Sequence, residues 1–229
     1  MARSVVCSSG GGTPRLGRRQ AIALAGSGMV VGFVNRVVAA APANIQLNVY
    51  RKGSLIGTHV IGFSQTSGLL KVTSQIDLQV KVAFITVYSY QQTANDDWEN
   101  GVLVRSRIQT NDDGKETLVQ AEVRDGQLAV QGPSGSSTTQ LGAMTDISFW
   151  NQAITQGPAL IDSQTAELIK IQVEGGTKER IMVRGQAVEA RRFSMTGTKG
   201  RSGSVWYDDA GSLVKAIVTT RGETLDYEL

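Results

Sequence analysis

The chain has 229 residues with a formal net charge of +3, one cysteine and one histidine, and 41% of its residues are hydrophobic. Five arginines and no acidic residue fall within positions 1–43, which leaves 18 basic and 20 acidic residues in the remainder. Because the positive charge belongs to the N-terminal segment, the composition argues against a nucleic-acid-binding protein.

The N-terminal 43 residues have the order of a cleaved signal peptide. A basic region containing Arg18 and Arg19 precedes an apolar run over 21–34, and small residues follow it. The run is too short to span a bilayer. The adjacent arginines are similar to the twin-arginine export pattern, and the general secretory route stays open as the alternative.

Cleavage after Ala40 and cleavage after Ala43 both fit the small-residue stretch. Cys7 precedes the apolar run, so it is not placed as the acylated cysteine of a lipoprotein. We expect export machinery and signal peptidase to act on this segment. The mature protein is expected to be periplasmic or secreted.

Residues 44–229 alternate between apolar and polar side chains, which is typical of strands with one covered face. From Ile76 to Tyr90 the alternation keeps one parity, which predicts one long bent strand or two joined by a bulge. Further runs cover 102–108, 118–123, 168–173, 180–183, 188–195, 205–207, 213–219 and 225–229. Turn signals separate them at Lys52-Gly53, 111–114, Asp125-Gly126, Gly175-Gly176, 208–211 and Arg221-Gly222.

The sequence therefore predicts a mainly β fold in a single β-rich domain over 44–229. An antiparallel meander of about ten strands should curl into an open or half β-barrel, with one or two short helices. One helix is expected between Thr145 and Ile154, docked on the concave face. The polar stretch from Pro133 to Gln140 is expected to form a mobile loop before it.

Candidate chemistry is sparse in residues 44–229. His59 alone cannot build the usual zinc site, and no nucleophile-elbow motif accompanies it, so we interpret it as a polar or edge-strand residue. The carboxylates at 96–97, 112–113 and 208–209 are interpreted as turn residues. No motif for a cofactor or metal is present, and we expect neither, nor an enzymatic activity.

Aromatic residues supply either core packing or the lining of an apolar cavity. If a cavity exists, we expect Tyr88, Trp98 and Trp206 to line it, with the segment around Trp150 and Asn151 as a lid. Asn151 would then offer a polar contact to a ligand head group, while a capping role is the alternative.

Several segments resemble an uncharacterised family of exported proteobacterial β-rich proteins, a domain of unknown function. They are Val87-Tyr88-Ser89-Tyr90, Trp98 to Leu103, Thr110 to Gly114, Phe149-Trp150-Asn151, Leu160-Ile161-Asp162 and Trp206 to Lys215. The last segment is also similar to hairpins of periplasmic lipoprotein carriers and their outer-membrane receptors. That resemblance implies an unclosed barrel with helices over a hydrophobic cavity.

Three functions remain open at this point. The first is a non-enzymatic periplasmic protein that binds a lipid or another hydrophobic molecule on the concave sheet. The second is a structural or interaction protein of the envelope without a ligand, which would show a contiguous exposed apolar patch. The third is a carboxylate-dependent hydrolase, which needs two acidic side chains in one cleft.

Overall fold

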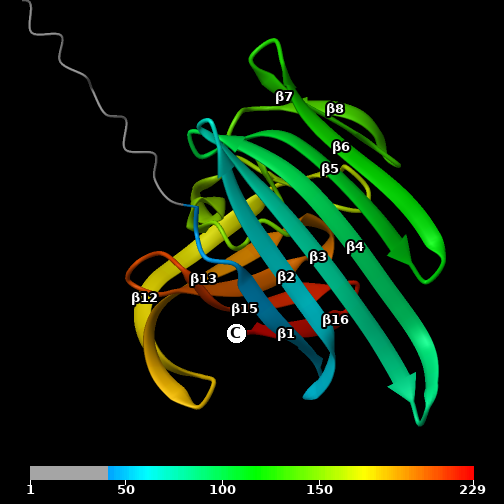
Figure 1. Cartoon of the computed structure of the whole chain (residues 1–229), viewed down its shortest axis with the longest axis vertical. Coiled ribbons are helices and arrows are strands. Elements are labelled where there is room, and N and C mark those ends of the chain that lie inside the picture. The colour runs from blue at the N-terminus through cyan, green and yellow to red at the C-terminus, as the bar shows by residue number, and fades with distance from the viewer. Residues whose placement is uncertain (1–40) are drawn as a thin grey trace, which may run out of the picture. The chain divides into compact units, whose positions relative to one another are not determined.

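One antiparallel sheet accounts for most of residues 41–229, the part of the chain that the computed structural model describes (Figure 1). The N-terminal half of this 13-stranded sheet consists of β1 (Ile45–Arg51), β2 (Ser54–Thr66), β3 (Leu69–Val82), β4 (Ile85–Glu99), β5 (Val102–Asp112), β6 (Lys115–Arg124), β7 (Gln127–Gly132) and β8 (Gly135–Thr139). The C-terminal half consists of β12 (Ile171–Val183), β13 (Gln186–Gly197), β14 (Ser202–Tyr207), β15 (Leu213–Thr220) and β16 (Glu223–Glu228).

The two halves meet in the middle of the sheet, where the first strand pairs with the last. The strand order is β12-β13-β14-β15-β16-β1-β2-β3-β4-β5-β6-β7-β8, and Asn48 of β1 lies opposite Glu228 of β16. Strands β8 and β12 are the two edges, so the curved sheet is not closed. The expected antiparallel, mainly β fold is confirmed, but the expected count of about ten strands was too low.

Tight turns with glycine at the second position join most neighbouring strands. In each of these turns both residues have positive φ, the conformation of type I′ hairpins, whose twist matches that of the strands they join. They are Lys52-Gly53, Ser67-Gly68, Asn100-Gly101, Asp113-Gly114, Asp125-Gly126, Arg184-Gly185 and Arg221-Gly222. These turns make each half of the sheet a meander.

Two expectations about turns were wrong. The stretch from Ile76 to Tyr90 is not one strand, because β3 ends at Val82 and the chain reverses through Ala83 and Phe84. The turn contains no Gly, Asn or Pro, so the sequence did not signal it. Gly175-Gly176 is not a turn but a bulge inside β12, where the register with β13 shifts.

The stretch from Pro133 to Gln140 also differs from the expected loop. Its residues Gly135 to Thr139 form β8, which pairs with β7 and ends the sheet. The Ser and Thr side chains suit this place, since one side of an edge strand faces solvent. The strand therefore has a composition typical of a loop, although its backbone pairs with β7.

A long connection between the two halves covers the concave face. It contains β9 (Met144–Thr145), the 3-10 helix η1 (Gln152–Gln156), β10 (Leu160–Ile161) and β11 (Leu168–Ile169). The three strands form a small sheet in the order β11-β10-β9. A second 3-10 helix, η2 (Thr198–Gly200), joins β13 to β14.

The helix expected between Thr145 and Ile154 was wrong. Thr145 belongs to β9, and its hydroxyl lies 2.7 Å from that of Ser148. Local side-chain bonds of this kind compete with helix formation. A single 3-10 turn follows at η1, and Ile154 is its buried residue.

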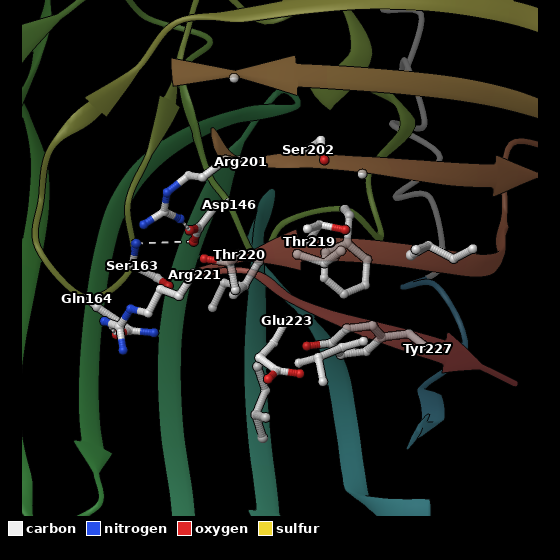
Figure 2. A pocket seen from close by; sticks show the side chains of 18 of the residues that line it. Asp146, Ser163, Gln164, Arg201, Ser202, Thr219, Thr220, Arg221, Glu223 and Tyr227 are labelled. Atoms are coloured by element: carbon white, nitrogen blue, oxygen red, sulfur yellow. Dashed lines mark hydrogen bonds and ion pairs between the residues drawn. The ribbon is translucent and has the colours of Figure 1, made fainter. Parts of the chain in front are cut away.

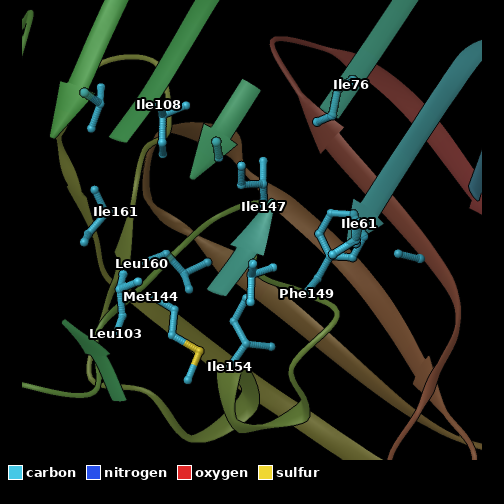
Figure 3. Packing of buried hydrophobic residues seen from close by; sticks show 14 of the residues in the cluster. Ile61, Ile76, Leu103, Ile108, Met144, Ile147, Phe149, Ile154, Leu160 and Ile161 are labelled. Carbon is cyan, nitrogen blue, oxygen red and sulfur yellow. The ribbon is translucent and has the colours of Figure 1, made fainter. Parts of the chain in front are cut away.

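The connection and the N-terminal half of the sheet enclose the main core. Figure 3 shows Ile61 and Ile76 of the large sheet in the same cluster as Ile147, Phe149 and Ile154 of the connection. Ile61 and Ile76 are buried because alternate residues of each strand point to the concave side, where the side chains of the connection pack against them. The concave face of this half is therefore packed by the chain's own residues.

The expected signal peptide, with Cys7, Arg18 and Arg19, lies outside the described residues apart from its last three positions. The residues of the domain expected over 44–229 lie together in one compact unit. No helix among residues 41–229 has the length and apolar character needed to cross a membrane.

Candidate functional site

A cavity of about 490 Å³ remains between the core and the C-terminal half of the sheet. Strands β3 and β4 form one side of it, β13 to β16 form the other, and the connection closes it between them. Its apolar lining comprises Ile56, Ile76, Leu78, Val80, Val87, Ile147, Phe149, Ile154, Leu160, Ile169, Ile171, Met195, Val205, Ile217, Val218 and Leu225. Aliphatic side chains thus form most of the wall.

Two groups of polar residues lie beside the cavity, and Figure 2 shows members of both. The first group is centred on Arg201, which immediately follows η2. Its Nη1 donates to Asp146 Oδ2 at 2.8 Å, and its Nη2 donates to Asp162 Oδ2. This ion-pair cluster ties the connection to the turn between β13 and β14.

Both carboxylates of the cluster are fully used. Asp146 Oδ1 accepts the backbone N–H of Ser163 at 3.1 Å, while Asp162 Oδ1 accepts those of Gln164 and Thr165. Burial and the neighbouring charge of Asp162 raise the pKa of Asp146 to about 6, against the lowering effect of Arg201. The arrangement is that of a structural clamp, since each oxygen has a partner.

The second group lies at the solvent-exposed rim and bridges the two halves of the sheet. Arg221, in the turn between β15 and β16, donates to Asp112 Oδ2 of β5 at 2.7 Å and to Gln164 Oε1 at 2.6 Å. Tyr88 Oη donates to Asp112 Oδ1 at 2.7 Å, and Gln164 Nε2 donates to Tyr90 Oη at 3.1 Å. Residues over 100 positions apart thus meet at the rim.

These bonds also set the charge state of the rim. Burial raises the pKa of Asp112, but the hydrogen bonds from Tyr88 and Arg221 outweigh it, so the pKa falls below its ordinary value. Nearby, Arg51 makes two hydrogen bonds to Glu223, of 2.8 and 2.6 Å, which lower the pKa of Glu223. The rim therefore presents paired charges at neutral pH.

His59 lies in the interior and not on an edge strand, contrary to one part of its interpretation. Its Nε2 is 2.6 Å from Ser74 Oγ. Its ring packs edge-to-face against the rings of Phe149 and Tyr227, with centroid distances of 5.4 and 5.9 Å. Burial lowers its pKa to about 3, so the imidazole is neutral. Neither His59 nor Ser74 lines the cavity.

The carboxylate pairs expected in turns have two outcomes. Asp113 occupies a type I′ turn, and Asp208 Oδ1 accepts the backbone N–H groups of Ala210 and Ser212 within its own turn. Asp96 and Asp97 do not occupy a turn, because both lie within β4. Asp96 is buried on the concave side, and its turn interpretation was wrong.

Only one of the nominated binding residues, Tyr88, is placed on the cavity wall. Trp98 is buried in the core against Trp150, with ring centroids 5.3 Å apart. Asn151 caps η1 by accepting the backbone N–H of Ala153 at 3.0 Å. Trp206 joins a separate small cluster with Ala190 and Val214 and donates from Nε1 to Glu179.

Sequence reasoning missed the aliphatic wall from the C-terminal strands. Ile217 and Val218 of β15 and Leu225 and Tyr227 of β16 line the cavity, although the alternation in 213–229 was recognised. The missing information was that β16 pairs with β1. Residues 41–229 contain no group of three or more His, Cys, Asp or Glu side chains that could hold a metal ion.

Comparisons with known proteins agree with the fold. A comparison with curated protein sequences finds no match. Among solved structures, the chain is similar to a beta-barrel-like protein of domain of unknown function DUF1849 from Brucella abortus, with a TM-score of 0.59 and 10% identity. That match covers 82% of this chain and 95% of the other, and at this identity it shows the fold alone.

The family comparison confirms the uncharacterised β-rich family expected from the sequence. Residues 47–229 match a model described as a domain of unknown function (DUF6134), which spans nearly all of the described residues. The chain therefore belongs to the DUF6134 family.

Proposed function

We propose that the mature chain is an exported, non-enzymatic binding protein that holds one apolar molecule, such as a lipid acyl chain, in the cavity of the concave face. The cavity itself carries the proposal. Its volume of about 490 Å³ falls within the range of small-molecule sites, about 300 to 1,000 Å³.

The distribution of polar groups supports an elongated ligand with one polar end. Phe149, Ile154 and Tyr227 are buried and form the inner wall, whereas Arg51, Arg221 and other paired charges mark the rim. An apolar tail would lie against the inner wall and remove it from water. A polar head would stay at the rim, among the groups that bind Tyr88 and Gln164.

The carboxylate-dependent hydrolase is less well supported. Asp146 and Asp162 converge beside the cavity, since Arg201 contacts both. Their oxygens are all engaged in hydrogen bonds, so neither offers a free position for proton transfer to a substrate. The pair stabilises the connection instead.

The first test is native mass spectrometry of the protein purified from its own host, followed by solvent extraction of any bound molecule. A co-purified lipid, at one molecule per chain, is the expected result. A native mass equal to that of the polypeptide alone, together with failure to bind a hydrophobic fluorescent probe, would overturn the proposal.

A pair of variants localises the binding. Val218→Trp places a large side chain in the cavity, because Val218 lines it, and should abolish probe binding. Val60→Trp adds the same side chain on β2 at an exposed position that does not line the cavity. If the Val218→Trp variant still binds the probe and the Val60→Trp variant does not, the binding site lies outside this cavity.

A further inference from the structure

The β3–β4 hairpin ends in a group of exposed apolar side chains. We call Val82, Phe84, Ile85 and Val87 the apolar tip; all four are exposed, and Phe84 is 99% accessible to solvent. Single exposed apolar residues are normal on a protein surface, but a group on one projection marks an interaction site. Nothing among residues 41–229 covers this tip.

The tip projects beyond the rest of the sheet. Leu78 is the last residue of β3 that pairs with β2, and Tyr90 is the first residue of β4 that pairs with β5. Ser89 O accepts the backbone N–H of Asp113 at 2.9 Å, so residues 79–88 are the part that pairs only with itself, and the hairpin continues past its last pairs with both neighbours (Figure 1). Four residues of strand correspond to about 13 Å of projection.

The apolar surface of the tip is continuous with the cavity. Ile76, Leu78 and Val80 line the cavity from alternate positions of β3, and Val82 continues this alternation into the tip. Val87 belongs to both the cavity wall and the tip. An apolar path thus leads from the end of the hairpin to the inner wall.

The charge around the tip suits an anionic surface. Lys81 is the single charged residue between Leu78 and Asn95, and it lies next to Val82. Residues 79–94 contain no carboxylate that would repel phospholipid head groups, and a lysine near an anionic bilayer strengthens binding about fivefold.

We propose that the apolar tip inserts into the interface of a lipid bilayer, with Lys81 among the head groups. The tip offers four exposed apolar residues, whereas a stable protein interface uses roughly 20 to 30 residues per partner. Insertion into the outer 5 to 10 Å of a bilayer needs only a short apolar element with basic flanks, for which about 13 Å of projection is sufficient.

This docking goes beyond ligand binding and does not depend on it. It would bring the cavity to the membrane, so that an apolar molecule could pass along the hairpin without crossing water. The two proposals can fail independently, because vesicle binding reports on the tip and probe binding reports on the cavity.

The test is co-sedimentation with vesicles of phosphatidylethanolamine and phosphatidylglycerol, using the protein purified from its host with its N-terminus determined. The double variant Phe84→Ser, Ile85→Ser should weaken vesicle binding by about tenfold for each substitution, because each removes a large apolar side chain from the interface. Both side chains are exposed, so folding and probe binding should not change.

Met182→Ser is the matched control, because Met182 is comparably exposed on β12 and should not affect binding. Lys81→Gln should weaken binding to the anionic vesicles about fivefold and leave binding to phosphatidylcholine vesicles unchanged. The proposal would be overturned if the wild-type protein did not bind vesicles or if the double variant bound them as strongly as wild type. It would also be overturned if Met182→Ser reduced vesicle binding as much as the double variant. Binding of the tip to a protein without vesicle binding would also overturn it.

Discussion

Replacing Asp96 with asparagine should stabilise the protein above neutral pH. Asp96 lies on β4 opposite Ser106 of β5, is 4% exposed, and has an oxygen without a hydrogen-bond partner among the described residues. Burial raises its pKa from 3.8 to about 7. At a pH above the ordinary pKa of aspartate, the folded chain must therefore either bury the Asp96 carboxylate as a charge or keep its proton, and both cost free energy.

The size of the effect follows from the difference between the two pKa values. Between pH 3.8 and about 7 the folded chain holds a proton that the unfolded chain has released, so the free energy of unfolding falls as pH rises. Each pH unit costs about 1.4 kcal/mol, and the whole interval costs about 4 kcal/mol. Asp96→Asn removes this loss, because its side chain does not titrate.

The assay is urea unfolding of wild type and variant between about pH 4 and pH 8. The stability of Asp96→Asn relative to wild type should increase by about 4 kcal/mol across this range. Groups common to both proteins cancel in the difference. Asp97→Asn is the control, because Asp97 lies on the other face of β4, 3.8 Å from Arg105. A difference that stays constant with pH would refute the reasoning.

Three further outcomes are expected. His59→Gln should remove a sensitivity of the fold to acid. Between about pH 3 and pH 6.5 the unfolded chain carries a proton on His59 that the buried side chain of the folded chain does not carry, so the free energy of unfolding of wild type should rise by about 4 to 5 kcal/mol as the pH rises from about 3 to 6.5. Urea unfolding of the variant should lack this rise. Ala83→Gly should raise the free energy of unfolding by about 0.5 to 1 kcal/mol, since Ala83 has a φ of 54° and glycine adopts it without steric cost; a loss of stability in urea would contradict this. Arg18→Lys with Arg19→Lys keeps the charge and should block export, as followed by fractionation and N-terminal mass, if the twin-arginine route is used, whereas normal processing would point to the secretory route.

The sequence predicted the fold class because alternation and glycine turns are local signals. It underestimated the number of strands, since Gly135 to Thr139 has the composition of a loop and the apolar turn at Ala83 and Phe84 continues the parity of β3. Both features depend on position in the sheet, at an edge and at a projecting hairpin. Neither is encoded in a local pattern of polarity.

The candidate site was predictable only in outline. A concave sheet was expected, with an apolar cavity as one of two alternatives; Tyr88 lies on the cavity wall, whereas the larger aromatics pack elsewhere. Trp98 fills the core and Trp206 lies in the second cluster. Residue size favours aromatics as candidates, whereas the wall is defined by which strands face one another across the fold.

The pairing of β1 with β16 separates the order of synthesis from the order of the sheet. Asn48 pairs with Glu228, so the centre of the sheet can form only after the β16 segment has been synthesised. Loss of the last strand alone would not shorten the sheet at one end. It would leave β1 and β15 as two unpaired edges in the middle, where neighbouring molecules could add strands of their own.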